Sequence, residues 1–403
     1  MQTRLVIGLS SGASRQGTQA ALVEANGAGP DLRLRLVHWL EKPYPAELRH
    51  WLWRSNGPDA GARTPALLHR VLGGWSAGVV AQLLEQAKVH VERVLCVGMN
   101  GQVIWHDSEG RHPTSLVLGM PEIVAEKTGL TIVSDFNLRD LAAGGAGMPG
   151  APSIDHLVFG DAREDRLLVH LGGWASCLFL PAGKDVGRLA GFQAAPCGLL
   201  LDGLMRLLTS GKEPFDAWGK HAVQGRCIEP LLQRWLAHPT LERKPPRSLS
   251  LEDFGEAFIA ESVAQARALE RSLHDVLCTA THFVAHAIAQ AATRFLPGQP
   301  GRVLLSGGGA RNGFLLRLIE QQLQPAPVEK LERHGCPGEA RHALGYAGLA
   351  LLALDGLPGN VPAVSGAAGP RLLGSFTPGA THNWARCLGW MAQQTAPFHA
   401  AAA

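Results

Sequence analysis

The chain has 403 residues, of which 46% are hydrophobic and 18% charged, and its formal net charge is only +3. This balance is typical of a globular protein long enough to bury a sizeable core. No basic arm or stripe indicates nucleic acid as a partner, and no stretch approaches the roughly 20 apolar residues of a membrane span. Seven scattered cysteines without metal-ligand spacing predict no metal site and a reducing, cytoplasmic location.

The first half of the chain is expected to alternate short buried strands with glycine-rich turns. In order, the expected elements are a strand at Arg4 to Leu9 with a turn from Ser10 to Gly12, a strand-like piece at 20–25, a helix-rich stretch at 63–92, a strand at Val94 to Val97, and a strand at Leu130 to Val133 that ends at Asp135. A segment rich in glycine, alanine and proline, Ala142 to Pro152, is expected to be a hinge between two halves.

The second half repeats this pattern with longer helices. Its expected elements are a strand at Leu167 to Leu171 before Gly172 and Gly173, a helix at 198–209, strong helical character at 255–295, a strand at Arg302 to Leu305 before Gly307 to Gly309, an amphipathic helix after that turn, and a helix at 338–354. The last residues, about 388–403, are expected to be a disordered tail. The sequence therefore predicts an α/β protein with ligand-binding turns at strand ends.

Three glycine-rich turns lie far apart in the sequence, at 10–17, 172–173 and 307–309. Glycine lets a backbone approach a ligand closely, and the exposed amides of such turns suit phosphate oxygens. None of the three fits the P-loop or the dinucleotide fingerprint, and each by itself is explained as a plain turn. Three such turns after three strands favour nucleotide binding.

Seven motifs in the same order resemble the anhydro-N-acetylmuramic acid kinase family, from about residue 5 to about residue 380. They are Ser10 to Gln19 (SSGASRQGTQ), Gly98 to His106 (GMNGQVIWH), Asp135 to Pro149 (DFNLRDLAAGGAGMP), His170 to Ser176 (HLGGWAS), Phe192 to Asp202 (FQAAPCGLLLD), Pro245 to Phe254 (PPRSLSLEDF) and Gly307 to Asn312 (GGGARN). The third motif is the most specific match.

The resemblance implies a two-lobed, actin-like ATPase (sugar kinase) fold with a cleft between the lobes. The first lobe is expected at residues 1–133, with a returning piece near 366–385. The second lobe is expected at 134–365 and includes a helical insertion. The resemblance leaves a homodimer open.

By resemblance, the activity is ATP-dependent phosphorylation of a sugar with hydrolytic opening of its 1,6-anhydro ring, in peptidoglycan recycling. The implied cofactors are ATP and Mg²⁺, and the implied partners are a small sugar and a nucleotide. The nucleotide-binding positions carried over are Ser11, Gly12, Ser14, Gly17, Gly172, Gly173, Gly307, Gly308, Gly309 and Asn312. The sugar-binding positions carried over are Gln102, His106, Asp135, Arg139 and Asp140.

The chain departs from the family where the chemistry is carried. Gln193 stands at the position of the aspartate that serves the family as general base, and an amide is not a useful base near neutral pH. Gln16 and Gln19 replace two aspartates of the opening loop, so Mg²⁺ binding is doubtful. Other family positions are also changed, at Asn100, Asn137, His170, Ser176, Leu251 and His342. The sequence therefore predicts a weak or inactive kinase, a pseudokinase that binds sugar or nucleotide, or a kinase of a different sugar.

Three retained aspartates keep the catalytic question open. Asp135 and Asp140 are candidate replacement bases, although an ion pair between Asp140 and Arg139 explains Asp140 equally well. Asp202 is expected to cap or anchor a helix. His106 is explained as readily by a structural role in its loop as by function, whereas His170, at the end of an apolar strand, is expected to be a buried, hydrogen-bonded histidine rather than a catalyst. The tryptophans at 51, 53, 75 and 105 are expected in a core or interface rather than on a sugar.

Overall fold

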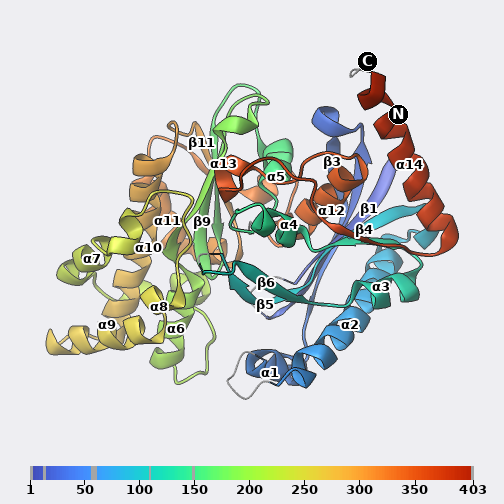
Figure 1. Ribbon diagram of the computed structural model, residues 1–403. Coiled ribbons are helices and arrows are strands. Elements are labelled where there is room, and N and C mark those ends of the chain that lie inside the picture. Colours follow the sequence, from blue (N-terminus) through green and yellow to red (C-terminus); the bar gives the residue numbers. More distant parts are fainter. Residues whose placement is uncertain (1–2, 12–14, 56–60, 109, 148–149, 401–403) are drawn as a thin grey trace. The chain divides into compact units, whose positions relative to one another are not determined.

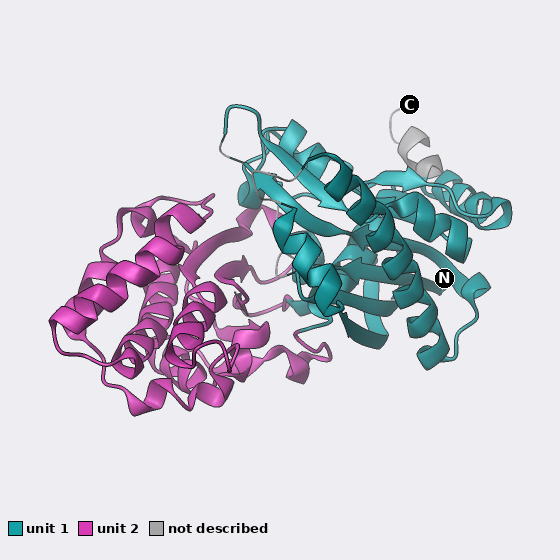
Figure 2. Cartoon of the chain, turned by 90° about the horizontal axis from the view of Figure 1, so that it is seen from below, with its two compact units in different colours: residues 1–159, 339–403 teal, residues 160–338 magenta. Residues whose placement is uncertain are grey.

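A computed structural model describes residues 3–11, 15–55, 61–108, 110–147 and 150–400, without the side chains of residue 30 and residues 395–400. The chain divides into two compact units, residues 1–159 with 339–403 (unit 1) and residues 160–338 (unit 2), which are coloured separately in Figure 2. Among the described residues, no helix is both long enough and apolar enough to cross a membrane.

Unit 1 contains a six-stranded mixed sheet in the order β13-β7-β4-β1-β2-β3 (Figure 1). Its strands are β1 (Arg4–Ser10), β2 (Gly17–Asn26), β3 (Arg33–Pro43), β4 (Val94–Asn100), β7 (Thr131–Ser134) and β13 (Ser375–Thr377). Strands β1, β4 and β7 are parallel neighbours, and β5 (Gln102–Asp107) and β6 (Thr114–Leu118) form a separate hairpin. The helices are α1 (Ala46–Arg54), α2 (Arg63–Ala87), α3 (Pro121–Thr128), α4 (Phe136–Ala142), α5 (Pro152–Phe159), α12 (Arg341–Leu354), α13 (Pro362–Ser365) and α14 (Thr381–Ala400).

Helices cover the two faces of this sheet because side chains alternate along each strand. Ile7 and Leu9 of β1 share a buried cluster with Val80 and Leu83 of α2. On the other face, α12 approaches the sheet at glycines: a Cβ on Gly8 would lie 1.7 Å from the Ala343 carbonyl oxygen. Glycine is needed there because any side chain would push α12 off the strand.

Unit 2 contains a five-stranded sheet in the order β10-β9-β8-β11-β12. Its strands are β8 (Arg166–Leu171), β9 (Trp174–Leu180), β10 (Ala190–Pro196), β11 (Arg302–Ser306) and β12 (Val328–Lys330). Its helices are α6 (Gly198–Leu208), α7 (Glu229–Leu236), α8 (Leu251–Phe254), α9 (Glu256–Ala268), α10 (Leu273–Phe295) and α11 (Gly313–Gln322).

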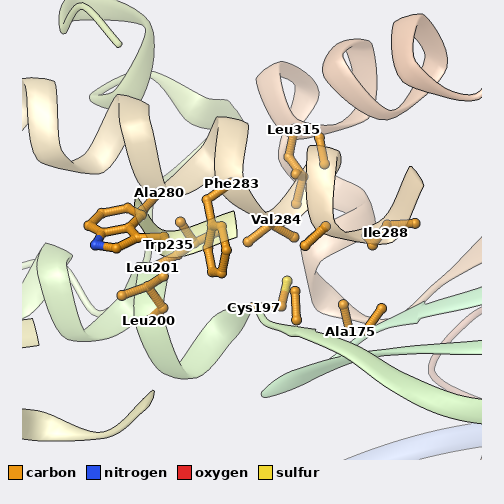
Figure 3. Packing of buried hydrophobic residues seen from close by; sticks show 14 of the residues in the cluster. Ala175, Cys197, Leu200, Leu201, Trp235, Ala280, Phe283, Val284, Ile288 and Leu315 are labelled. Atoms are coloured by element: carbon orange, nitrogen blue, oxygen red, sulfur yellow. The ribbon is translucent and has the colours of Figure 1, made fainter. Parts of the chain in front are cut away.

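The core of unit 2 lies between the sheet and the helices α6, α7 and α10. Figure 3 shows Leu200 and Leu201 of α6 gathered with Trp235 of α7 and Phe283 of α10. The rings of Trp235 and Phe283 meet edge to face, with centroids 5.5 Å apart. This packing fixes α6, which carries Asp202 and whose first amides close the turn at Gly172 and Gly173.

The predicted strands at 4–9, 94–97, 130–133, 167–171 and 302–305 match β1, β4, β7, β8 and β11 within three residues. The division into units differs from the predicted lobes, because residues 134–159 and 339–365 belong to unit 1. The reason is packing: α12 lies against β1 and β4, and α4 follows directly from β7. The predicted hinge at 142–152 therefore falls within unit 1, and the described part of the predicted tail, up to residue 400, continues α14.

Candidate functional site

The expected site residues of unit 1 meet at one edge of its sheet. The carboxyl ends of the parallel strands β1, β4 and β7 lead to Ser11, Gly101 and Asp135, and the Ser11 amide donates to the Asn100 carbonyl over 3.1 Å. Parallel neighbours must end on the same side, so three motifs far apart in sequence converge there. This is the edge at which open α/β sheets bind ligands.

The opening loop is only partly described, since Gly12 and Ser14 lie outside the described residues. The buried Ser11 hydroxyl lies 3.0 Å from the Thr18 hydroxyl, which in turn donates to Tyr44. Gly17 begins β2 against β3, where a Cβ would lie 2.5 Å from the Lys42 carbonyl oxygen. The contacts of Ser11 and Gly17 are therefore explained by packing of the loop ends.

Arg15, which the sequence analysis did not single out, is buried in this loop. Its guanidinium donates to the carbonyls of Leu52 and Ile104 and lies 4.8 Å from the Trp53 ring centroid. Burial lowers the pKa of this guanidinium. A buried cation beside the loop opposes the binding of a second cation there.

The side chains of the two loop glutamines do not fit Mg²⁺. Gln16 accepts a long hydrogen bond of 3.4 Å from Arg49, and Gln19 donates one of 3.4 Å to Glu41. Mg²⁺ binds through carboxylates and water in octahedral geometry. Among the described residues, no group of three histidine, cysteine or acidic side chains is placed to hold a metal ion. In the described part of the chain, the side-chain partners of the two glutamines are one guanidinium, Arg49, and one carboxylate, Glu41, which is a poor ligand set for a hard cation.

The expected sugar-side residues of unit 1 differ in exposure. Gln102 is buried on β5 and donates to the Val103 carbonyl over 3.1 Å, whereas Arg139 on α4 is exposed. The His106 ring nitrogen Nε2 lies 3.1 Å from the Ala146 carbonyl oxygen. Asp135 is half-buried and accepts from the Ser134 hydroxyl over 2.9 Å. His106 and Arg139 are thus the more accessible of the set.

Asp140 is completely buried and is surrounded by hydrogen-bond donors of unit 1. Its Oδ1 accepts from the Asn360 amide and the Ser365 hydroxyl, both over 2.8 Å, and its Oδ2 accepts from the Gly147 amide over 3.0 Å. These bonds tie the end of α4 to the segment around α13. The fold alone accounts for this carboxylate, and the described residues include no ion pair between Asp140 and Arg139.

In unit 2, the parallel strands β8 and β11 bring the other two glycine turns together. His170 is paired in register with Ser306, and its Nδ1 lies 3.1 Å from the Ser306 hydroxyl. Cβ atoms on Gly172 and Gly307 would lie 2.8 Å and 3.0 Å from the His170 ring. The imidazole is therefore wedged between the two turns, and the missing side chains of the glycines make room for it.

The turn at Gly172 and Gly173 is closed by the start of α6. The amides of Cys197 and Leu199 donate to the Gly173 carbonyl, and the Gly198 amide donates to the Gly172 carbonyl, over 2.9–3.1 Å. Helix N-terminal amides can bind phosphate when they are free. Here these three amides are already used within unit 2.

The third turn remains more open. Gly307 has a φ of +87°, and a Cβ on Gly308 would meet no described atom within 4 Å. Asn312 ends the turn as the N-cap of α11, where its Oδ1 accepts from the Leu315 amide over 3.0 Å. The capping bond is sufficient to explain the asparagine.

Gln193, at the position of the family base, is fixed on β10 by the segment before α8. Its Oε1 accepts from the Leu249 amide over 2.7 Å, and its backbone amide and carbonyl pair with Arg247 over 3.2 Å and 3.0 Å. Burial lowers the pKa of the Arg247 guanidinium to about 10. The amide oxygen of Gln193 is thus occupied by a backbone donor.

Asp202 is expected from the sequence to cap or anchor a helix; it lies in the second turn of α6 and does not cap it, because the N-cap is Cys197 and the C-cap is Thr209. Its Oδ2 is 3.4 Å from where a Cβ on Gly198 would lie, and the described residues offer it no hydrogen bond. Burial raises its pKa to about 6, and Arg206 partly opposes this shift. Asp202 is therefore a carboxyl group that titrates near neutral pH beside the Gly172 turn.

Comparison with known proteins gives a consistent result over nearly the whole chain. The family model for anhydro-N-acetylmuramic acid kinase matches residues 4–379. The chain is 37% identical over 388 residues to the anhydro-N-acetylmuramic acid kinase of Gloeobacter violaceus, covering 94% of this chain and 100% of that protein. It is 35% identical over 381 residues to the protein of that name from Cupriavidus pinatubonensis, covering 92% and 98%.

Among solved structures, the chain is similar to the activator of the 2-hydroxyisocaproyl-CoA dehydratase from Clostridium difficile with bound ADPNP, at 14% identity and a TM-score of 0.43, covering 86% of this chain and 94% of that chain. The α/β class expected from the sequence is confirmed by the sheets and helices of both units. The chain belongs to the anhydro-N-acetylmuramic acid kinase family.

Proposed function

We propose that this chain is a divergent anhydro-N-acetylmuramic acid kinase-like protein that binds an anhydro sugar and an adenine nucleotide, with catalytic turnover weak or lost. The observation that carries this proposal is Gln193 at the position of the family base. Its amide cannot accept a proton near pH 7, and its Oε1 already accepts from the Leu249 amide at 2.7 Å. A positioned base contributes roughly 10²–10⁴-fold in rate, which is the scale of the expected loss.

The nucleotide half of the proposal is supported by the open Gly308 turn and the retained Asn312 in unit 2. Binding of Mg²⁺ at the opening loop is not supported, because the side chain of Gln16 is bonded to Arg49 and that of Gln19 to Glu41. We therefore expect ADP to bind weakly and Mg²⁺ to add little to its affinity. Calorimetry with ADP, with and without Mg²⁺, tests this, and a tight complex that depends strongly on Mg²⁺ would contradict it.

The test of turnover is direct. The purified full chain is incubated with ATP and 1,6-anhydro-N-acetylmuramic acid, and phosphorylated product is detected by mass, with the Gloeobacter violaceus relative as positive control. We expect product at least about 10²-fold below that of the relative. Comparable rates in the two proteins would overturn the proposal.

One observation favours a second candidate, a kinase of a different sugar. Asp202, whose pKa burial raises to about 6, is half-buried beside the Gly172 turn and would be a usable base near neutral pH. Under this reading, turnover of some sugar depends on Asp202, and Asp202→Asn abolishes it. Asp140 is a weaker candidate because its oxygens accept from Asn360, Ser365 and Gly147.

A further inference from the structure

Trp218 is an exposed aromatic residue of unit 2 whose position the fold does not explain. It lies in the short 3₁₀ turn Ala217–Gly219, between α6 and α7, and its side chain is 73% exposed. No other large apolar side chain in the described ranges is exposed to this extent. An indole left in water gains nothing from burial, so packing does not account for it.

The backbone of Trp218 is also unfavourable for this residue type. Its φ is +62°, in the left-handed region that suits glycine or asparagine and is costly for a bulky side chain. The turn itself is held by Asp216, whose two carboxylate oxygens accept from the amides of His221 and Ala222 over 3.0 Å. Neither the turn nor the core requires an aromatic ring at this position. Strain kept at an exposed site is an indication of function.

The turn is packed against the start of α11. A Cβ on Gly219 would lie 2.6 Å from Asn312 Oδ1 and from Phe314 Cβ, and one on Gly313 would lie 3.5 Å from the Trp218 carbonyl oxygen. Trp218 is therefore held beside the Asn312 cap, at the end of the turn that leaves open space at Gly308. Lys220 next to it forms an ion pair of 2.8 Å with Glu213, so the charge there is already compensated.

We propose that Trp218 is the stacking surface for the base of an adenine nucleotide bound at the turn Gly307 to Gly309; this rests on the nucleotide binding proposed above. The flat face of an indole stacks on the flat face of a base, and such contacts are worth about tenfold or more in affinity. The ring supplies base contact, and the open glycine turn supplies the approach for the rest of the nucleotide. The cost of the left-handed backbone is then offset when the ligand is bound.

The test compares ADP with pyrophosphate, which has no base, by calorimetry on the full chain. Trp218→Gly removes the ring and suits the left-handed backbone, so its melting temperature is expected to stay within about 2 °C of the parent or to rise. We expect Trp218→Gly to bind ADP about tenfold more weakly than the parent, or weaker still, and Trp218→Phe to bind ADP almost as tightly as the parent. The affinity for pyrophosphate is expected to be unchanged in both variants. Trp51→Ala, on α1 of unit 1 and 45% exposed in the parent, is the matched control and is expected to bind ADP as the parent does.

A second readout follows the ring itself. In protein labelled with 5-fluorotryptophan, the ¹⁹F resonance of Trp218 is identified as the one that is absent from Trp218→Phe. In the parent, this resonance is expected to shift when ADP is added and to stay in place when pyrophosphate is added. Equal ADP affinity of the parent and Trp218→Gly would overturn the assignment of Trp218 and leave nucleotide binding intact. If the parent binds no ADP at all, the proposed function fails as well as the assignment.

Discussion

Two aspartates, one in each unit, show how differently retained carboxylates are used. Asp140 in unit 1 is fully buried and accepts three hydrogen bonds, from Asn360, Ser365 and Gly147. Asp202 in unit 2 is half-buried, has no hydrogen bond from the described residues, and has its pKa raised to about 6 by burial. The oxygens of Asp140 are occupied by donors of the fold, whereas burial without such donors raises the pKa of Asp202 and favours its neutral form.

The comparison shows that keeping or losing a residue in a motif does not settle its role. Asp140 is retained, yet the fold alone accounts for it. Gln193 is a replacement, and it too is bound to the fold, through the Leu249 amide. Asp202 is a retained group whose setting near the Gly172 turn leaves it chemically available. The donors around a side chain decide what it can do.

The largest expected effect comes from restoring the family carboxylates. Gln193→Asp alone is expected to give little or no turnover, because the opening loop of unit 1 still carries Gln16 and Gln19. Adding Gln16→Asp and Gln19→Asp is expected to raise turnover by more than the product of the separate effects, up to about 10²–10⁴-fold, since groups that act as a unit are not additive. Product is measured by mass, as phosphorylated muramic acid.

Gln193→Asn is the matched control for that experiment. It has the length of aspartate, so it breaks the same bond to Leu249, but its amide cannot accept a proton. Rapid turnover by the parent chain would contradict the comparison at once and would direct attention to Asp202. Activity in the asparagine control would show that the base is elsewhere.

The next effect is on stability and concerns Asp140. Asp140→Ala removes the acceptor of the Ser365 hydroxyl and the Gly147 amide, and it leaves the Asn360 amide only the Gly369 carbonyl; this is expected to cost about 3 kcal/mol in the free energy of unfolding of unit 1. Asp140→Asn keeps one oxygen and is expected to cost less. Urea unfolding measures both, with Asp135→Asn as control, because this half-buried aspartate accepts a single hydrogen bond from Ser134 and asparagine tolerates its left-handed backbone.

The control is expected to cost about 1 kcal/mol or less. If Asp140→Ala instead unfolds at the parental urea concentration and loses sugar binding, then Asp140 contacts the sugar and the structural interpretation is wrong. Sugar binding is measured by calorimetry on the folded variants, so the two outcomes are separate.

The strand ends and their glycine turns could be predicted from the sequence, whereas the partners of the site residues could not. Short apolar runs before glycine gave β1, β4, β8 and β11, since a buried strand followed by a turn has a local signature. Strands β9 and β10 were not predicted: Ser176 interrupts the apolar run of β9, and Gly191, Gln193 and Pro196 interrupt that of β10. Asp140 meets Asn360 across 220 residues, a pairing that local patterns cannot show.

The same limit explains the division into units and Trp218. Residues 339–365 belong with unit 1 because α12 packs on β1, a contact between the two ends of the chain. Trp218 stands in a turn whose left-handed backbone is normally signalled by glycine or asparagine, so the sequence gives no sign of it. What the residues do at both sites depends on tertiary contacts.

A smaller effect is expected from Asp202 and depends on pH. Its pKa is raised in the folded state, to about 6 from an ordinary 3.8, so the folded chain binds the proton more tightly than the unfolded chain. Below about pH 4 the carboxyl group is neutral in both the folded and the unfolded chain, and its burial does not lower the free energy of unfolding. As the pH rises from there through 6, the buried group must ionise, and the free energy of unfolding falls. Asp202→Asn removes the charge and is expected to stabilise unit 2 by about 2 kcal/mol at pH 8, allowing for partial solvent screening, with little change at pH 4.

Urea unfolding at the two pH values measures this difference, and Asp253→Asn is the control. Asp253 is an aspartate of unit 2 that accepts from Ser250 over 2.9 Å, so neutralising it is not expected to stabilise the fold at pH 8. A loss of stability in Asp202→Asn at pH 8 would show that the ionised carboxylate makes a favourable contact, and the comparison with Asp140 would then fail.

The smallest effect is expected at Asn312, which is either only the N-cap of α11 or also a contact to the nucleotide. Asn312→Ala removes the side-chain oxygen that accepts from the Leu315 amide, and losing such a cap costs about 1 kcal/mol. Asn312→Ser keeps a capping oxygen, so its free energy of unfolding is expected to stay within a few tenths of a kcal/mol of the parent. If the asparagine serves only as a cap, then ADP affinity follows stability, falling in the alanine variant and holding in the serine variant. If the serine variant is as stable as the parent but binds ADP more weakly, the amide group itself contacts the nucleotide, because the cap is intact and only the amide has been lost.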